Sequence, residues 1–142
     1  MNLCSKISYK SAKLLNNRIY ADMHDDKYAA EEVEITWDNY LGSKKYQEGE
    51  FIDDYYDNIH GKYYYAPTYA EVIDWLFNRR IVIEFKPSYT FALVDRVAYY
   101  FTVYLKDDGG FKKIFDQNME MSSFNLAMET IIEFLINEKY ID

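Results

Sequence analysis

The sequence is poor in the residue types that most often build reactive sites. Cys4 is its single cysteine, so no internal disulfide can form and an oxidising compartment is not implied. Two histidines are present to serve as a base, and no nucleophile elbow surrounds any serine. The five glycines form no loop that could cradle a phosphate. These absences predict a protein without catalytic activity and without a cofactor.

Long apolar runs are also missing. No stretch approaches the length of a membrane span. The first residues, MNLCSKISYKSAKLL, contain no continuous apolar core of signal-peptide length. The sequence therefore predicts no membrane association and a cytoplasmic location.

Positive charge is scarce relative to negative charge. The chain has 16 Lys and Arg against 24 Asp and Glu, which gives a net charge of −8. Residues 1–66 and residues 67–142 each carry 8 basic and 12 acidic residues, so neither half hides a basic domain. Because such a chain repels a phosphate backbone, its charge argues against nucleic-acid binding. Two interpretations stay open, namely solubility alone or an acidic surface for a basic partner.

The acidic residues form no recognisable metal site. Two clusters contain a histidine but lack the spacing of a zinc site: Asp22, His24, Asp25 and Asp26, and Asp57 with His60. A third set, Asp53, Asp54 and Asp57, lacks the glycine and the closing glutamate of a calcium loop. We interpret these groups as solvated surface charge and predict no bound metal.

Aromatic residues are abundant, with 16 Tyr, 9 Phe and 2 Trp. In the first half of the chain, helical spacing predicts a short helix over Ser5–Asn17 that stops at Asn16 and Asn17. Alternation of apolar and polar residues predicts a strand over Val33–Trp37. Gly42 and Ser43 then indicate a turn or loop.

The stretch Glu48–Asp57, EGEFIDDYYD, carries five carboxylates and no basic residue. It fits a ragged helix after Gly49 or an ordered loop. An extended segment, Tyr63–Tyr65, leads from it to Pro67, since a residue before proline avoids helical geometry. Tyrosine mixed with aspartate is typical of protein-contact surfaces. We therefore predict exposed tyrosine and a partner-binding site here: Asp53, Asp54, Tyr55, Tyr56, Asp57, Tyr63 and Tyr64.

The second half of the chain has clear periodicity. Thr68 and Glu71 have the spacing of a capping box, which predicts the start of a helix that Arg79 and Arg80 close. One buried helix face is predicted at helical spacing: Tyr69, Val72, Ile73, Leu76 and Phe77.

Strands are predicted after this helix. The first is Ile81–Phe85, with a break at Pro87–Ser88, and apolar residues 89–94 follow. The longest strand is Val97–Lys106, and its drier face should meet the core: Val97, Tyr99, Phe101, Val103 and Leu105. A hairpin turn at Asp107–Gly110 returns the chain into Phe111–Asp116.

A last helix is predicted with Ser122 or Ser123 as its N-cap. Its inner face should hold six apolar residues: Phe124, Ala127, Met128, Ile131, Ile132 and Leu135. These elements predict an α+β fold, in which a helix–three-stranded antiparallel sheet–helix unit over residues 67–142 is elaborated by residues 1–66. We see no internal repeat or linker, so residues 1–142 are predicted to form a single domain.

In element order this unit resembles the double-stranded RNA-binding domain. That family grips phosphates with lysines at the start of its last helix, whereas Met119–Asn125 contains no basic residue here. A related alternative is a stacking platform for single-stranded nucleic acid, with Tyr99, Tyr100 and Tyr104 on the outer face of the sheet. The other interpretation is that residues 1–66 cover this face.

A second resemblance is closer at the level of the amino-acid sequence. The strings PTYAEVIDWL, TFAL and AYYFTVYLK resemble small proteins carried by phages and mobile elements of gut anaerobic bacteria. The similarity covers roughly residues 67–135 and has no assigned activity attached to it. It implies an origin, and it favours an accessory, non-enzymatic role.

Together these observations lead to a hypothesis about function. We expect a small acidic accessory protein, related to phages or mobile elements, that binds another protein. The alternative is a nucleic-acid-binding module that lacks the usual basic residues, and self-association stays open.

Overall fold

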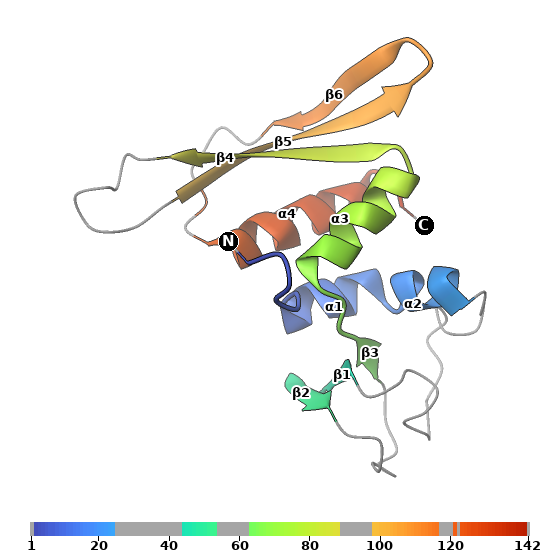
Figure 1. Cartoon of the computed structure of the whole chain (residues 1–142), viewed down its shortest axis with the longest axis vertical. Coiled ribbons are helices and arrows are strands. Elements are labelled where there is room, and N and C mark those ends of the chain that lie inside the picture. The colour runs from blue at the N-terminus through green and yellow to red at the C-terminus, as the bar shows by residue number, and fades with distance from the viewer. Residues whose placement is uncertain are drawn as a thin grey trace. The chain divides into compact units, whose positions relative to one another are not determined.

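A computed structural model describes residues 2–24, 44–53, 63–88, 98–116, 121 and 123–141. These residues form an α+β fold with two three-stranded antiparallel sheets, as the sequence predicts for the fold class (Figure 1). The chain divides into two compact units. The N-terminal unit is Asn2–Tyr69, and the C-terminal unit begins at Ala70. The predicted boundary, between residues 66 and 67, lies three residues earlier, and the single-domain assignment stays a prediction.

In the N-terminal unit, helix α1 spans Tyr9–Leu15 and helix α2 spans Arg18–His24. Ser8 caps α1, because its side chain accepts a hydrogen bond from the Ser11 N–H at 3.2 Å. The predicted stop is confirmed, since Asn16 and Asn17 have φ angles of 48° and 64°. The helix is shorter than predicted, and α2 was not predicted.

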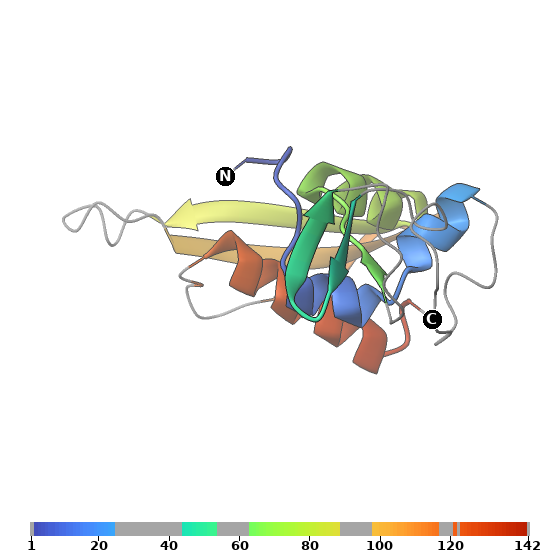
Figure 2. The ribbon, with the colours of Figure 1, turned by 90° about the horizontal axis from the view of Figure 1, so that it is seen from below.

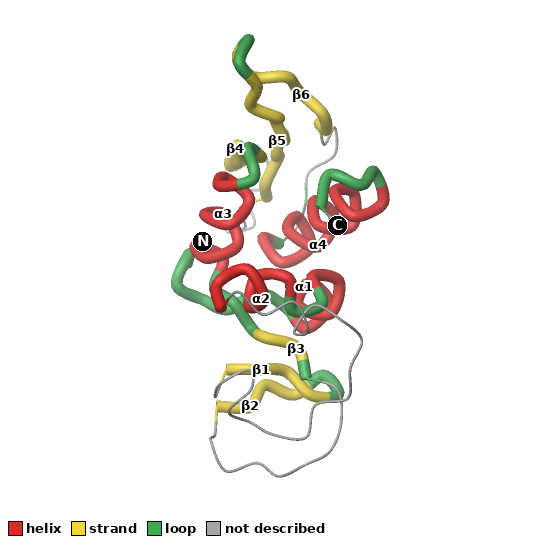
Figure 3. Tube along the Cα trace, turned by 90° about the vertical axis from the view of Figure 1, so that its right-hand side faces the viewer, coloured by secondary structure: helices red, strands yellow, loops and turns green. Residues whose placement is uncertain are grey.

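The sheet of this unit has the order β2-β1-β3, with β1 at Lys44–Gln47, β2 at Glu50–Asp53 and β3 at Tyr64–Tyr65 (Figure 3). A ragged helix or an ordered loop was predicted over Glu48–Asp57, and this prediction is wrong at Glu50–Asp53, which forms a strand. Gln47 pairs with Glu50 across the two-residue turn Glu48–Gly49. Both turn residues have positive φ, 51° and 88°, which is the conformation that joins two twisted strands most tightly. The extended conformation predicted before Pro67 is confirmed by β3.

Two backbone hydrogen bonds tie the start of the N-terminal unit to its end. The Ile7 N–H donates to the Pro67 carbonyl at 2.9 Å, and the Tyr69 N–H donates to the Ser5 carbonyl at 3.0 Å. Ile7 is buried although it precedes α1. The first and last residues of this unit therefore meet.

In the C-terminal unit, α3 spans Tyr69–Asn78 and begins directly after Thr68, as predicted. Val72 and Leu76 are fully buried, but the predicted burial of Phe77 is wrong, because 55% of its surface is exposed. Trp75 is buried in its place, with the Arg79 guanidinium 4.4 Å from the centre of its ring. Tyr69, Val72 and Leu76 belong to both the predicted and the observed buried stripe, so the two differ at one edge, where Trp75 takes the place of Phe77.

The second sheet has the order β4-β5-β6: β4 is Ile81–Ser88, β5 is Ala98–Asp107 and β6 is Gly110–Asp116 (Figure 1). Figure 2 shows β4 and β5 side by side. The three predicted antiparallel strands are confirmed, but the predicted break at Pro87 is wrong. Pro87 lies within β4 and pairs with Tyr99 of β5. Because β4 is an edge strand, the missing N–H of proline can face away from its neighbour.

The hairpin between β5 and β6 is confirmed as well. Asp107 pairs with Gly110, and the Asp107 carboxylate accepts a hydrogen bond from the Gly109 N–H at 2.8 Å. Gly110 has a φ of 119°, a conformation that side chains other than glycine rarely adopt. The turn chemistry of the sequence thus fixes where β5 ends.

Helix α4 spans Phe124–Asn137, with Ser123 as its N-cap. The Ser123 hydroxyl accepts from the Leu126 N–H at 3.1 Å. All six residues predicted for the inner face are buried. Helices α3 and α4 lie on the same side of the β4-β5-β6 sheet (Figure 1), which confirms the helix–sheet–helix unit.

Aromatic rings fill the space between this sheet and α4. The ring centres of Phe85 and Tyr99 lie 4.5 and 5.8 Å from that of Phe124. Phe115 stacks on Phe134, with their ring centres 4.3 Å apart. Phe101 is 1% exposed. The helix-facing side of the sheet, which we call the inner face, is therefore the core of this unit, and its other side is the outer face.

The predicted strands at Val33–Trp37 and over residues 89–94 lie outside the described residues.

Candidate functional site

The register of the second sheet decides which side chains share its outer face. Val82 pairs with Tyr104, Glu84 with Thr102 and Lys86 with Tyr100. Directly opposite residues of antiparallel strands point to the same side. Since Phe85 and Phe101 form the alternate pair and belong to the core, these three pairs lie on the outer face.

Strand β6 adds further residues to this face. Tyr104 pairs with Lys113 and Lys106 pairs with Phe111. The register shifts between Val103 and Tyr104, where β6 carries one residue more than β5. Phe111 lies diagonally across from Tyr104, and their ring centres lie 6.4 Å apart in an edge-to-face arrangement.

These residues surround an open concavity of about 220 Å³. It is lined by Val82 and Glu84 of β4, Tyr104 of β5 and Phe111 of β6. Phe111 is the most exposed large apolar residue within the described ranges, at 63%. A concavity of this size lies below the ~300–1,000 Å³ of typical small-molecule sites. It is large enough to receive a side chain from another molecule.

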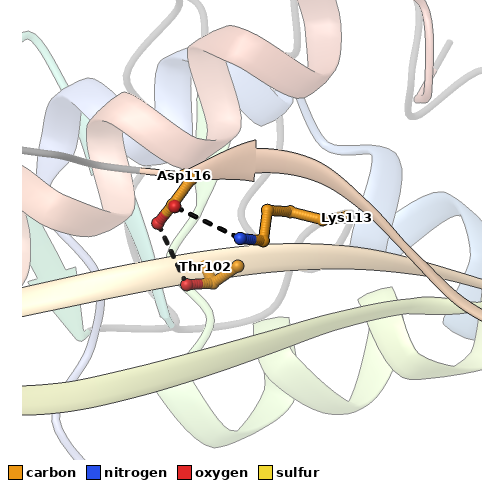
Figure 4. A network of polar contacts seen from close by, with 3 residues as sticks. All are labelled: Thr102, Lys113 and Asp116. Carbon is orange, nitrogen blue, oxygen red and sulfur yellow. Dashed lines mark hydrogen bonds and ion pairs between the residues drawn. The ribbon is translucent and has the colours of Figure 1, made fainter.

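One polar cluster lies further along the same face (Figure 4). The Thr102 hydroxyl donates to the Asp116 carboxylate at 3.2 Å, and Lys113 pairs with the other carboxylate oxygen at 3.4 Å. All three groups are solvent-accessible, so this ion pair adds little stability. Its consequence here is that the charge of Lys113 is offset by Asp116.

Glu84 is different, because it is exposed and makes no hydrogen bond or ion pair in the described parts of the chain. Among the residues that the structure describes, it is the only charged one that lines the concavity. The outer face therefore combines an exposed ring, a side-chain-sized hollow and one unneutralised carboxylate.

The partner-binding residues predicted from the sequence fall in three groups. Asp53 is exposed at the end of β2. Tyr63 is 0% exposed and Tyr64 is 6% exposed, so the prediction of exposed tyrosine is wrong at these two positions. Asp54, Tyr55, Tyr56 and Asp57 lie outside the described residues. The binding role of this site stays a prediction.

Tyr63 and Tyr64 are buried because they belong to the core of the N-terminal unit. Tyr20 and Ile52 pack against Tyr63, and the Lys45 ammonium lies 5.5 Å from the centre of its ring. Tyr64 meets Tyr9 edge to face, with ring centres 6.0 Å apart. Their aromatic character serves packing in this unit.

Two buried polar side chains hold this core in place. Asn17 donates to the Tyr63 carbonyl at 2.9 Å and accepts from the Tyr65 N–H at 2.7 Å. The Tyr46 hydroxyl donates to the Ile7 carbonyl at 2.6 Å, and burial raises the pKa of this phenol above its ordinary value. Both residues are structural. The sequence predicts Asn17 only as part of a helix stop, and it gives no role to Tyr46.

The three tyrosines named for a stacking platform do not all lie on one face, and the stacking function stays a prediction. Tyr99 packs against Phe124 on the inner face, so its placement on the outer face is wrong. Tyr100 and Tyr104 do lie on the outer face, half-buried. Val82, Glu84 and Phe111 were missed as site residues, although every second residue of the predicted strands carried the necessary signal.

Within the described ranges, no three His, Cys, Asp or Glu residues lie close enough to hold a metal ion. His24 is the last residue of α2, while Asp25, Asp26 and His60 lie outside the description. Cys4 is exposed as a free thiol.

Among the helices described here, none is long and apolar enough to cross a membrane.

Comparison with known proteins found no match: no family model, no curated protein and no solved structure is similar to this chain.

Proposed function

We propose that this chain is a small accessory protein that binds another protein through the outer face of the β4-β5-β6 sheet and carries out no catalysis. The observation that carries the proposal is Phe111, 63% exposed beside the concavity that Tyr104 and Val82 line. Exposed aromatic residues beside a hollow are typical anchors of protein interfaces. The proposal includes a cytoplasmic location and an origin in a phage or mobile element, for which the sequence resemblance is the support.

Phe111 is better suited to this role than the other exposed phenylalanines. Phe51 of β2 is 38% exposed, and its ring already contacts Tyr46 and the Lys6 ammonium, the latter 4.0 Å from the ring centre. Phe77 of α3 is 55% exposed but lines no concavity among those described. Of the three exposed phenylalanines in the described ranges, only Phe111 combines wide exposure with a hollow and a second aromatic ring.

The test is affinity capture from a host lysate with the full chain as bait. Phe111→Ser should lose the captured protein, because truncating a central aromatic anchor weakens binding by about 30-fold or more. Phe77→Ser is the matched control, since it removes a similarly exposed ring, and it should retain the partner. Equal behaviour of the two variants, or the capture of no specific protein, would refute the proposal.

The alternative surface is the acidic stretch predicted around Asp53. It would be supported if Asp53→Lys abolished capture while Phe111→Ser left it intact.

A nucleic-acid-binding function is the second candidate. Lys86, Lys106 and two half-buried tyrosines share the outer face, which favours stacking of single-stranded bases. Glu84 and the overall charge of −8 oppose it. A salt-dependent shift of labelled single-stranded DNA or RNA by micromolar protein would support this candidate, and no shift at low salt would end it.

A further inference from the structure

The concavity on the outer face has a defined chemistry as well as a shape. Its walls are two aromatic rings, Tyr104 and Phe111, and the aliphatic Val82. Glu84 is the one charged residue that the described part of the chain contributes to these walls. Val82 and Glu84 are separated by one residue on β4, so both side chains stand on the same side of the strand, next to each other.

Size indicates what can occupy the concavity. About 220 Å³ is too small for a typical cofactor or metabolite pocket, but it accommodates one large apolar side chain. The open surface of a sheet suits an extended segment, because such a segment presents alternate side chains toward the sheet. An anchor residue in the hollow would therefore bring a near neighbour in its own chain to the rim.

Charge indicates what that neighbour should be. Glu84 is exposed and makes no ion pair in the described parts of the chain, so its carboxylate is available to a cation. Lys113 of β6, which lies on the same face, is already paired with Asp116 at 3.4 Å. A lysine or arginine of the partner can approach Glu84 without displacing an internal partner.

We infer that the outer face binds an extended peptide segment in which a large apolar side chain fills the concavity and an adjacent lysine or arginine pairs with Glu84. This inference rests on the proposed function, since it names the chemistry of the partner at the same surface. It also fits the overall charge of −8, which favours encounter with basic segments.

A random library of short displayed peptides, selected on the full chain, tests the inference. The recovered sequences should share a large apolar residue with Lys or Arg within two positions of it. Glu84→Lys should weaken the binding of a recovered peptide by about tenfold, because an attractive pair becomes a repulsive one. Selection on Glu84→Lys should instead recover Asp or Glu at the same position.

Asp74→Lys is the matched control. Asp74 is an exposed residue of α3, and its substitution changes the net charge of the protein by the same amount. It should leave the affinity for the recovered peptide within about twofold, since a distant surface charge is screened by salt. Circular dichroism spectra of the two variants should match that of the unaltered protein.

The outcomes separate the inference from the function on which it rests. Peptides that lose binding with Phe111→Ser but carry no basic residue would overturn the inference and leave the proposed function standing. Peptides that bind Phe111→Ser as well as the unaltered protein would overturn both. Preferential binding of oligothymidylate over every selected peptide would show that the partner is a nucleic acid, and would also overturn both.

Discussion

Each of the two units of this protein is stabilised internally in a different way. The C-terminal unit is built from periodic apolar residues, which meet in an aromatic layer between the sheet and α4. The N-terminal unit depends on single polar side chains that join distant parts of the chain, above all Asn17 and Tyr46. The C-terminal unit is thus stabilised by apolar packing at regular spacing, whereas the N-terminal unit also requires hydrogen bonds between residues far apart in the sequence.

The largest expected effect is in the regular unit. Ile131→Ala removes a fully buried side chain from the middle of α4 and should lower the free energy of unfolding by about 2–5 kcal/mol. Urea denaturation followed by circular dichroism measures this change. Leu126→Ala is the control, because Leu126 of the same helix is 41% exposed and should cost far less. Equal costs at the two positions would contradict the placement of the inner face.

The second prediction concerns Asn17 in the N-terminal unit. Asn17→Ala should lower the free energy of unfolding by about 2–4 kcal/mol, because the Tyr63 carbonyl and the Tyr65 N–H lose the hydrogen bonds that the Asn17 side chain makes to them away from solvent. Hydrogen exchange of residues 63–65 should rise more than exchange in α4. Asn125→Ala, at an exposed position of α4, is the control and should change neither. An unchanged exchange rate at residues 63–65 would show that Asn17 does not hold this strand.

Tyr46 gives a smaller effect with a characteristic pH dependence. Tyr46→Phe should cost about 1 kcal/mol at neutral pH, because the hydrogen bond to the Ile7 carbonyl is lost. Burial raises the pKa of the Tyr46 phenol above its ordinary value of 10.0, so the unfolded chain ionises first as the pH rises. The stabilisation of the folded state by the protonated Tyr46 hydroxyl is fully present below pH 10, and it is lost as the pH rises through the pKa of Tyr46 in the folded protein.

The stability difference between the unaltered protein and Tyr46→Phe should therefore shrink above pH 10. Tyr104→Phe serves as the control, since no hydrogen bond is described for the Tyr104 hydroxyl. A difference that stays constant between pH 8 and pH 11 would contradict the buried, hydrogen-bonded state of Tyr46.

The smallest expected effect on stability is at Phe111. Phe111→Ala should change the free energy of unfolding by no more than about 0.5 kcal/mol, because the ring is mostly exposed. A cost above about 2 kcal/mol would show that Phe111 belongs to the core and not to a binding surface. Thermal unfolding of the variant, compared with Phe77→Ala, makes the distinction.

The sequence predicts the C-terminal unit well for physical reasons that are visible in single elements. The six inner residues of α4 repeat at helical spacing, and Asp107–Gly110 contains the glycine that its turn requires. Both signals are local, so tertiary contacts reinforce them and do not override them. Helical spacing alone did not decide which edge of the stripe faces the core, and the structure buries Trp75 and exposes Phe77.

The N-terminal unit was predicted poorly because its determinants are long-range. Asn17 bonds to residues 46 and 48 positions away, and no spacing rule connects them. The β1–β2 hairpin was hidden by a turn that needs a positive φ at Glu48, where the sequence offers no asparagine or aspartate to mark it.

The candidate site was only partly visible in the sequence. Tyr104 was recognised as an outer-face residue, but Phe111 and Glu84 were not. Glu84 and Phe111 lie on the outer face with Tyr104 through the register between strands, in which Glu84 pairs with Thr102 and Phe111 pairs with Lys106. Alternation within one strand shows which of its own residues share a face, but it does not give the register that brings residues of three strands together.

The most direct test of the proposed binding surface uses three phenylalanines that are all exposed. A photoreactive benzoylphenylalanine would replace Phe51, Phe77 or Phe111 in turn, and each protein would be irradiated with the captured partner or a selected peptide. The account predicts a covalent adduct from position 111 and none from positions 51 and 77. An adduct from position 51, next to the acidic residues of β2, without one from position 111 would contradict it.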